Sequence, residues 1–254
     1  MVQEEAVEQI VASLTRDNLV QAIFLKGSMG RGEHDQYSDV DLYCLVEEQD
    51  KQSFLKNRLE HLRAYRALLF YDDIFIIAPQ IIAVFDNMVH VDLFTVTEDT
   101  YVEKDYIKVL FDPNHLLDKY KETQHLTLSS AEFQDDVNDV SWFLFQYKKS
   151  ADRGNDLWSV SMLHHAMIHV ARVLLHRYKP ERAQLGLKAL ETSLSEEILV
   201  RINNILQFLT PNNHKKGVML ICALMANETE WILSNLENRE STAAFLETMI
   251  HKTF

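Results

Sequence analysis

The sequence predicts an α+β protein with two parts: a mixed sheet with helices over residues 1–127, and an all-α region over residues 128–254. The first part alternates helical periodicity with short apolar runs, which are typical of buried strands. After about residue 120 the strand signals stop and helical periodicity dominates. A chain of 254 residues is long enough for two ordinary domains, so we expect one domain for each part.

The first part shows its elements through the spacing of apolar residues. Helices are expected where apolar residues recur every three or four positions, and strands where apolar runs are short or alternate. We expect a turn at Asp86-Asn87 and a break at Pro79. In chain order the expected elements are a helix over 3–16, strands over 19–25 and 39–46, a helix over 51–65, and strands over 74–77, 80–85 and 88–96.

The second part reads as helices throughout. Pro180 and the Thr210–Asn213 cluster mark breaks between them. The expected helices cover 131–150, 156–178, 183–190, 196–209, 216–235 and 241–251.

A glycine-serine pair and two alternating aspartates carry the strongest functional signal. Gly27-Ser28 follows the first apolar run, and Asp39 and Asp41 lie at the start of the next strand. Because side chains alternate along a strand, the two carboxylates share one face, about 6.5 Å apart along the chain. Two acids this close repel each other unless a cation lies between them, and hard oxygen ligands suit Mg²⁺ together with substrate phosphates. The pattern therefore predicts a metal and a phosphate-bearing substrate.

This ordered pattern resembles the DNA polymerase β-like nucleotidyltransferase superfamily. The form Gly-Ser-x-x-Arg-Gly-x5-Ser-Asp-Val-Asp-Leu is similar to the aminoglycoside nucleotidyltransferase branch. The resemblance implies a third carboxylate on a later strand, and Asp92 in the run from Met88 to Val96 matches it. It also implies ATP or another nucleoside triphosphate as co-substrate, and Mg²⁺ held by Asp39, Asp41 and Asp92.

The resemblance implies roles for further residues. Ser28 and backbone N–H groups near Gly27 would cradle the terminal phosphates, and Arg31 would shape that loop or contact a phosphate. Asp92 would bind the metal, accept the proton of the acceptor hydroxyl, or do both. In the helical part, an aromatic and basic stretch is similar to one with which the family holds the triphosphate, so we expect Lys148 or Lys149 to contribute a positive charge. The alternative for these lysines is a solvated helix end.

Composition limits the partners. The chain has 25 Lys and Arg against 38 Asp and Glu, for a net charge of −13, which argues against a nucleic-acid partner and suits a cationic small substrate. The sequence contains no run of about 18 apolar residues and no signal-peptide pattern, so we expect a cytoplasmic protein without a membrane partner. Cys44 and Cys222 lie in apolar settings and are expected to be reduced core residues. The chain would be a monomer or a homodimer.

Two minor clusters in the helical part have competing interpretations. His165 and His169 share a helix face, as zinc ligands can, although core or cleft-lining histidines fit the sequence better. Asp135, Asp136 and Asp139 would favour a helix start, or would meet a cationic acceptor.

The predicted function is nucleotidyl transfer, with AMP moving from ATP to the hydroxyl of a small acceptor. An aminoglycoside is the acceptor that the resemblance suggests, and a lincosamide-like compound is nearly as well supported. Such an activity would confer antibiotic resistance. Protein adenylylation, and a catalytically silent nucleotide-binding or antitoxin-type module, are the alternatives. A phosphatase that forms an aspartyl-phosphate is a weaker rival, because its Asp-x-Asp motif should end the first strand without a preceding Gly-Ser pair.

Overall fold

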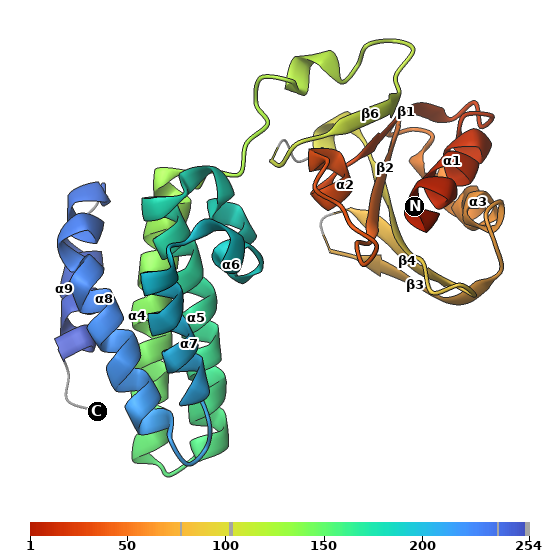
Figure 1. Ribbon diagram of the computed structural model, residues 1–254. Coiled ribbons are helices and arrows are strands. Elements are labelled where there is room, and N and C mark those ends of the chain that lie inside the picture. The colour runs from red at the N-terminus through yellow and green to blue at the C-terminus, as the bar shows by residue number, and fades with distance from the viewer. Residues whose placement is uncertain (77, 102–103, 238, 252–254) are drawn as a thin grey trace. The chain divides into compact units, whose positions relative to one another are not determined.

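The computed structural model describes residues 1–76, 78–101, 104–237 and 239–251, and the chain forms two compact units, Met1–His125 and Leu126–Phe254 (Figure 1). The first unit combines a mixed sheet with helices, and the second is built from helices. This arrangement confirms the predicted α+β fold class with an all-α C-terminal region.

The first unit is built on a six-stranded sheet with the order β3-β4-β5-β2-β1-β6. The strands are β1 (Val20–Leu25), β2 (Val40–Val46), β3 (Leu68–Phe75), β4 (Pro79–Phe85), β5 (His90–Val96) and β6 (Lys108–Phe111). β2 and β5 are parallel, and every other neighbouring pair is antiparallel. The sheet is therefore mixed, and its parallel pair lies in the interior.

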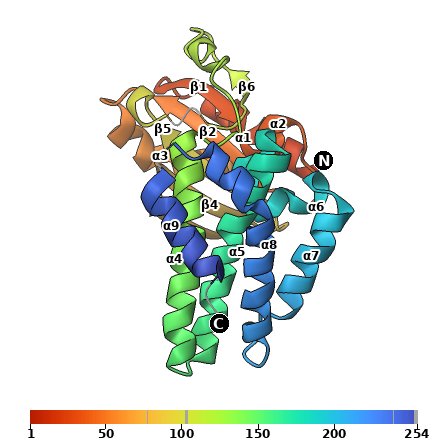
Figure 2. The ribbon, with the colours of Figure 1, turned by 90° about the vertical axis from the view of Figure 1, so that its left-hand side faces the viewer.

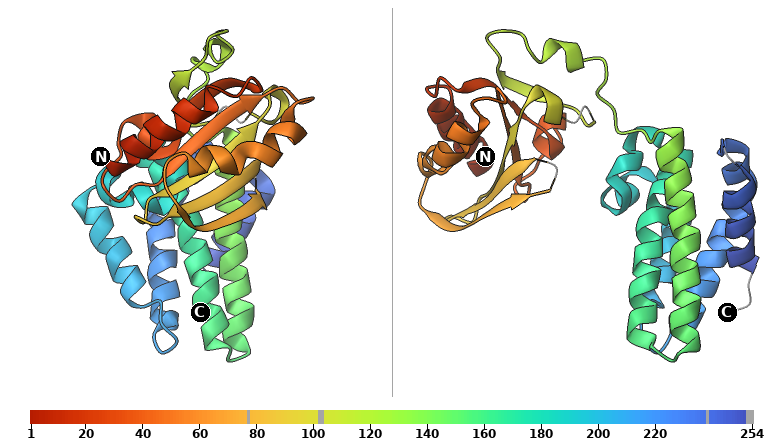
Figure 3. Two further views of the ribbon diagram at one scale, coloured as in Figure 1. Left: turned by 90° about the vertical axis from the view of Figure 1, so that its right-hand side faces the viewer. Right: turned by 180° about the vertical axis from the view of Figure 1, so that it is seen from behind.

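Helices cover one face of this sheet. α1 (Val2–Leu14) and α3 (Lys51–Arg63) lie on that face (Figure 3). Their apolar sides pack against inward residues of β1, β2, β4 and β5, such as Leu25, Leu42 and Leu93. Residues of the opposite face form a smaller cluster around Phe24 and Tyr101. Successive side chains of a strand point to opposite faces of the sheet. Asp41 and Tyr43 of β2 and Asp92 of β5 therefore point to that opposite face.

Three strands differ from the sequence prediction. β3 begins at Leu68, six residues before the apolar run that predicted it, because it is an edge strand whose side chains are mostly exposed on both faces. An edge strand needs no buried face, so no alternation of apolar residues reveals it. Pro79 begins β4 rather than separating two strands, and its ring suits a first strand position. β6 was not predicted, and its residues are exposed or half-buried.

The second unit consists of long helices and short turns. α4 (Ser130–Asp152) and α5 (Asp156–Tyr178) pack along each other, as Figure 2 shows. They are followed by η3 (Pro180–Ala189), α6 (Leu190–Ser193), α7 (Glu196–Gln207), α8 (His214–Asn235) and α9 (Arg239–His251). The segment predicted as an α-helix over 183–190 is mostly 3₁₀, because Gly186 has a φ of 54° and interrupts it. None of the described helices is long and apolar enough to cross a membrane.

One member each of the acidic and histidine clusters, Asp136 and His169, belongs to a hydrogen-bond network of this unit. Asp136 is 4% exposed and accepts hydrogen bonds from His169 Nδ1 at 2.9 Å and from Arg172 Nε at 2.8 Å. His165 and His169 both stack on the ring of Phe143. A buried carboxylate needs such partners, so this network explains Asp136 and His169 without a ligand. Cys44 and Cys222 are free thiols and are buried, as predicted.

Removing the Asp136 carboxylate should destabilise the second unit, because the charge of Arg172 would lose its buried partner. We expect Asp136→Ala to lower the free energy of unfolding by about 3 kcal/mol. The matched control is Asp135→Ala, since Asp135 is exposed on the same helix turn and should change stability by less than about 0.5 kcal/mol. Urea denaturation followed by circular dichroism measures both values, and equal losses would contradict the prediction.

Candidate functional site

The register of two parallel strands places two carboxylates side by side. Asp41 in β2 is the direct partner of Asp92 in β5. Asp39 lies one residue before β2 begins, and it shares the face of Asp41 because side chains alternate. The three acids predicted from the sequence therefore come to the same end of the sheet from two segments that are about fifty residues apart.

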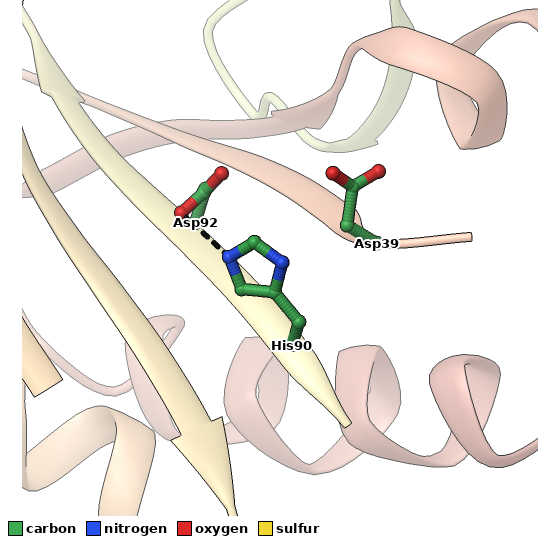
Figure 4. Close-up of side chains that lie close together, drawn as sticks. All are labelled: Asp39, His90 and Asp92. Carbon is green, nitrogen blue, oxygen red and sulfur yellow. Dashed lines mark hydrogen bonds and ion pairs between the residues drawn. The ribbon is translucent and has the colours of Figure 1, made fainter. Parts of the chain in front are cut away.

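Two of these acids form a compact group with a histidine that the sequence analysis missed. One ligand atom each from Asp39, His90 and Asp92 lies within 4.8 Å of the others (Figure 4). His90 Nε2 is 3.1 Å from Asp92 Oδ1. This hydrogen bond, aided by the negative charges of Asp92, Asp39 and Asp41, raises the pKa of His90 above its usual value despite partial burial. His90 precedes Asp92 by two residues, so strand alternation could have revealed it.

Gly27 is placed where only a glycine fits. Its φ is +60°, in the left-handed region, and an added Cβ would lie 2.0 Å from Asp41 Oδ2. The Asp41 carboxylate therefore occupies the space directly above the Gly27 backbone. Any larger residue at position 27 would displace that carboxylate, so the Gly-Ser pair and the aspartate form one unit.

Ser28 offers a hydrogen-bonding group to a ligand. It lies in the short helix α2 (Gly27–Arg31), and its Oγ is buried and has no hydrogen-bond partner among the residues that the structure describes. A buried hydroxyl without a partner costs free energy, so its position requires an explanation outside the packing of the fold. Contact with a substrate group is such an explanation, and it agrees with the role that the sequence analysis gave Ser28.

The sequence profile of the nucleotidyltransferase domain family matches residues 7–137, slightly more than half of the chain. The matched range contains the Gly-Ser pair and all three carboxylates. The chain belongs to the nucleotidyltransferase domain family. The resemblance to nucleotidyltransferases drawn from the Gly-Ser and Asp-x-Asp pattern is thereby confirmed.

Solved structures with overall similarity to this nucleotidyltransferase include an aminoglycoside 6-adenyltransferase from Bacillus subtilis. The match covers 98% of this chain and 99% of that chain, at 13% identity and a TM-score of 0.38. A nucleotidyltransferase-like protein from Exiguobacterium sibiricum matches with 13% identity and a TM-score of 0.35, covering 97% of this chain and 71% of that chain. No curated protein sequence matches significantly.

Arg31 is engaged within the nucleotidyltransferase domain itself. Its Nη1 donates to Asp105 Oδ2 at 2.6 Å, and its Nε donates to Glu33 Oε2 at 2.9 Å. The guanidinium thus ties the end of α2 to the segment around residue 105. Of the two roles that the sequence analysis gave Arg31, these contacts favour shaping the loop.

Lys26 is a second cation beside the Gly-Ser pair, and the sequence analysis missed it. The residue is 6% exposed, and its Nζ donates to the carbonyl oxygen of Lys104 at 3.0 Å. The ammonium also lies over the rings of Tyr101 and Tyr43, at 4.7 and 5.3 Å from their centroids. Burial lowers the pKa of Lys26 to about 8, although the charge of Asp105 opposes the shift. Lys26 and Arg31 therefore hold the two ends of α2 to one segment, residues 104–105.

The two lysines predicted from the second unit lie near the end of α4. Lys148 Nζ donates to both carboxylate oxygens of Asp152 at 2.7 Å, and Lys149 Nζ lies 5.4 Å from the centroid of Phe145. Lys148 is about 27 Å along the helix from Ser130, the first residue of α4. The contact of Lys148 or Lys149 with a triphosphate stays a prediction.

The low pKa of Lys26 predicts a pH dependence of stability. The unfolded chain holds the proton up to the ordinary value of 10.5, whereas the folded chain releases it near 8. Between these values the unfolded state binds more protons, so stability should rise with pH. We expect the free energy of unfolding of the wild type to rise by about 1.5 kcal/mol relative to Lys26→Met between pH 8 and 9.5.

Chemical denaturation at a series of pH values measures this difference. Lys56→Met is the matched control, because Lys56 is exposed on α3 and should follow the wild type. A Lys26→Met profile parallel to that of the wild type would show that Lys26 keeps its ordinary pKa.

Proposed function

We propose that this nucleotidyltransferase is Mg²⁺-dependent and transfers AMP from ATP to a hydroxyl group of a small acceptor, releasing pyrophosphate. Membership of the nucleotidyltransferase domain family supports the reaction type. The Mg²⁺ dependence and the transfer of AMP to a hydroxyl group are supported by the pairing of Asp41 with Asp92, which gathers three carboxylates beside the Gly-Ser pair.

The chemistry of the side chains fits Mg²⁺. Asp39, Asp41 and Asp92 supply carboxylate oxygens from one end of the sheet, and Mg²⁺ prefers oxygen ligands shared with substrate phosphates. His90 suits this metal less well, so we assign it the hydrogen bond to Asp92. Mg²⁺ bound by these carboxylates would neutralise charge on the triphosphate.

The Gly-Ser pair would hold the phosphates that leave. The buried Ser28 hydroxyl can donate to a phosphate oxygen, and the absence of a side chain at Gly27 lets the backbone come close to it. Lys148 and Lys149 would add positive charge if the second unit contributes to the triphosphate site, as the resemblance implies.

Asp92 is the proposed general base. In the proposed reaction, its carboxylate takes the proton of the acceptor hydroxyl while the hydroxyl oxygen forms a bond to the α-phosphorus. The bond from the α-phosphorus to the bridging oxygen breaks, and pyrophosphate leaves. His90 acts as a positioning residue, because its hydrogen bond fixes the orientation of the Asp92 carboxylate.

The resemblance of the motif to the aminoglycoside branch suggests an antibiotic-type acceptor. A cationic aminoglycoside would be attracted by the net negative charge of the chain. A lincosamide-like compound would need only one reactive hydroxyl. The second unit would help to close over the nucleotide or the acceptor.

The proposed reaction predicts that Asp39→Asn and Asp41→Asn abolish catalysis. We expect ATP with Mg²⁺ to raise the melting temperature of the wild type, and pyrophosphate to be released when a suitable acceptor is present. Each variant should lower the rate of release by at least about a thousandfold, because the phosphates lose charge compensation. Asp72→Asn is the matched control, since Asp72 is an exposed acid on β3 of the same sheet.

The outcomes of this experiment separate the alternatives. ATP binding without pyrophosphate release from any small acceptor would favour a protein acceptor. A wild type that neither binds ATP with Mg²⁺ nor releases pyrophosphate would reject the proposed function in favour of an interaction module.

The role of His90 predicts a different kinetic pattern. We expect His90→Ala to lower kcat by about 10- to 100-fold, because Asp92 loses the partner that orients it, while the affinity for ATP changes little. His90→Gln should recover part of the activity, since its amide can donate to Asp92. His164→Ala serves as the control because His164 is exposed on α5. Steady-state kinetics of pyrophosphate release decide the matter, and an unchanged kcat in His90→Ala would refute the assignment.

A further inference from the structure

A cavity of about 470 Å³ adjoins the Asp39–His90–Asp92 group within the first unit. Asp39 and His90 form part of its wall. The rest comes from the start of α1, the loop before β2 and the turn between β4 and β5. Its volume falls in the range of small-molecule sites.

The cavity and the Gly-Ser pair adjoin different acids of the site. The Gly-Ser pair lies against Asp41, whereas the cavity is lined by Asp39 and His90 and by neither Gly27 nor Asp41. The carboxylates of Asp39, Asp41 and Asp92 therefore lie between the Gly-Ser pair and the cavity. In nucleotidyl transfer the attacking and leaving oxygens are roughly in line across the phosphorus. With pyrophosphate at the Gly-Ser pair, the acceptor belongs on the cavity side.

We propose that this cavity binds the acceptor, and that the acceptor is an uncharged or singly charged hydroxylated compound rather than a polycation. The proposal rests on the proposed function and names the substrate class of its site. Among the described residues that line the cavity, only Asp39 and His90 carry a group that is charged near neutral pH. Asp39 is also a proposed metal ligand, so no carboxylate is left to pair with several ammonium groups.

The wall of the cavity is held in place before any ligand binds. Gln3 is 3% exposed, and its Nε2 lies 2.9 Å from the carbonyl oxygen of Gln36 and 3.1 Å from that of Ser38. Asp35 Oδ1 accepts from the Tyr37 backbone N–H at 2.9 Å and from Ser38 Oγ at 3.0 Å. The loop is therefore fixed although the Tyr37 side chain is 85% exposed. An exposed aromatic ring carried on a fixed backbone is a ready surface for the apolar face of a sugar-like ring.

A strained residue lies in the turn between β4 and β5, which forms another part of the wall. Met88 has a φ of 65° and a side chain that is 72% exposed. A large side chain disfavours this left-handed conformation, so glycine or asparagine would be the stable choice for the turn alone. The exposed thioether agrees with a contact to a ligand, for which methionine is an adaptable surface.

Direct binding measurements test the cavity without relying on turnover. The probes are lincosamides, methyl glycosides and inositols as uncharged or singly charged compounds, and aminoglycosides as polycations. We expect the full chain to bind at least one of the former more tightly than any aminoglycoside, measured by saturation-transfer NMR and calorimetry. In Tyr37→Ala the dissociation constant should rise about tenfold. Phe75→Ala, which removes an exposed ring from β3, should leave it unchanged.

A second variant separates binding from folding. Met88→Gly relieves the strained backbone, so its melting temperature should equal or exceed that of the wild type while the dissociation constant rises severalfold. The proposal is overturned if aminoglycosides bind more tightly, if no uncharged or singly charged probe binds, or if Tyr37→Ala and Met88→Gly bind the probe as the wild type does.

A parallel titration with ATP and Mg²⁺ distinguishes this inference from the proposed function. Tyr37→Ala and Met88→Gly should keep the ATP affinity of the wild type, because neither residue lies at the Gly-Ser pair. A wild type that binds a hydroxylated probe through Tyr37 but does not bind ATP would reject nucleotidyl transfer and leave the cavity assignment standing.

Discussion

The parallel pairing of β2 with β5 is the constraint on which the rest of the site depends. It sets Asp41 opposite Asp92 and brings His90 next to Asp39. A slip of one residue would turn these acids into the apolar layer under α1 and α3, and would turn Leu42 and Leu93 toward solvent. The buried leucines and valines therefore fix the register, and the register fixes the carboxylates. Hydrophobic packing on one face creates the arrangement of charge on the other.

The Gly-Ser segment and the loop before Asp39 complete the site. Each is held by hydrogen bonds to residues distant in sequence. The Gly-Ser pair is flanked by Lys26 and Arg31, which hold Lys104 and Asp105. The loop before Asp39 receives hydrogen bonds from Gln3 of α1. Loops gain a defined geometry when such bonds replace water, and a site made of them is organised before the substrate arrives.

The sequence predicted the parts that follow from alternation and spacing. The apolar positions of the second strand gave the common face of Asp39 and Asp41, and the resemblance supplied Asp92. His90 could have been found by the same alternation. Lys26, Tyr37 and Met88 could not, because their importance arises from segments far apart in the chain: a carbonyl oxygen at residue 104, a glutamine at position 3, and a turn with positive φ. Tertiary contacts of this kind leave no periodic signal.

The two adjacent acids in the middle of β3 have a consequence for the behaviour of the purified protein. β3 is an edge strand that exposes Leu69, Phe70 and Phe75, and its outer backbone groups have no neighbouring strand among the residues that the structure describes. Such an edge is a template for pairing with another chain, and charged side chains within it are the usual protection. Asp72 and Asp73 interrupt the apolar run at its centre, so a second copy would have to bring four carboxylates together in order to add its own strand. The charges of Asp72 and Asp73, which interrupt the apolar pattern of this strand, thus also oppose its aggregation.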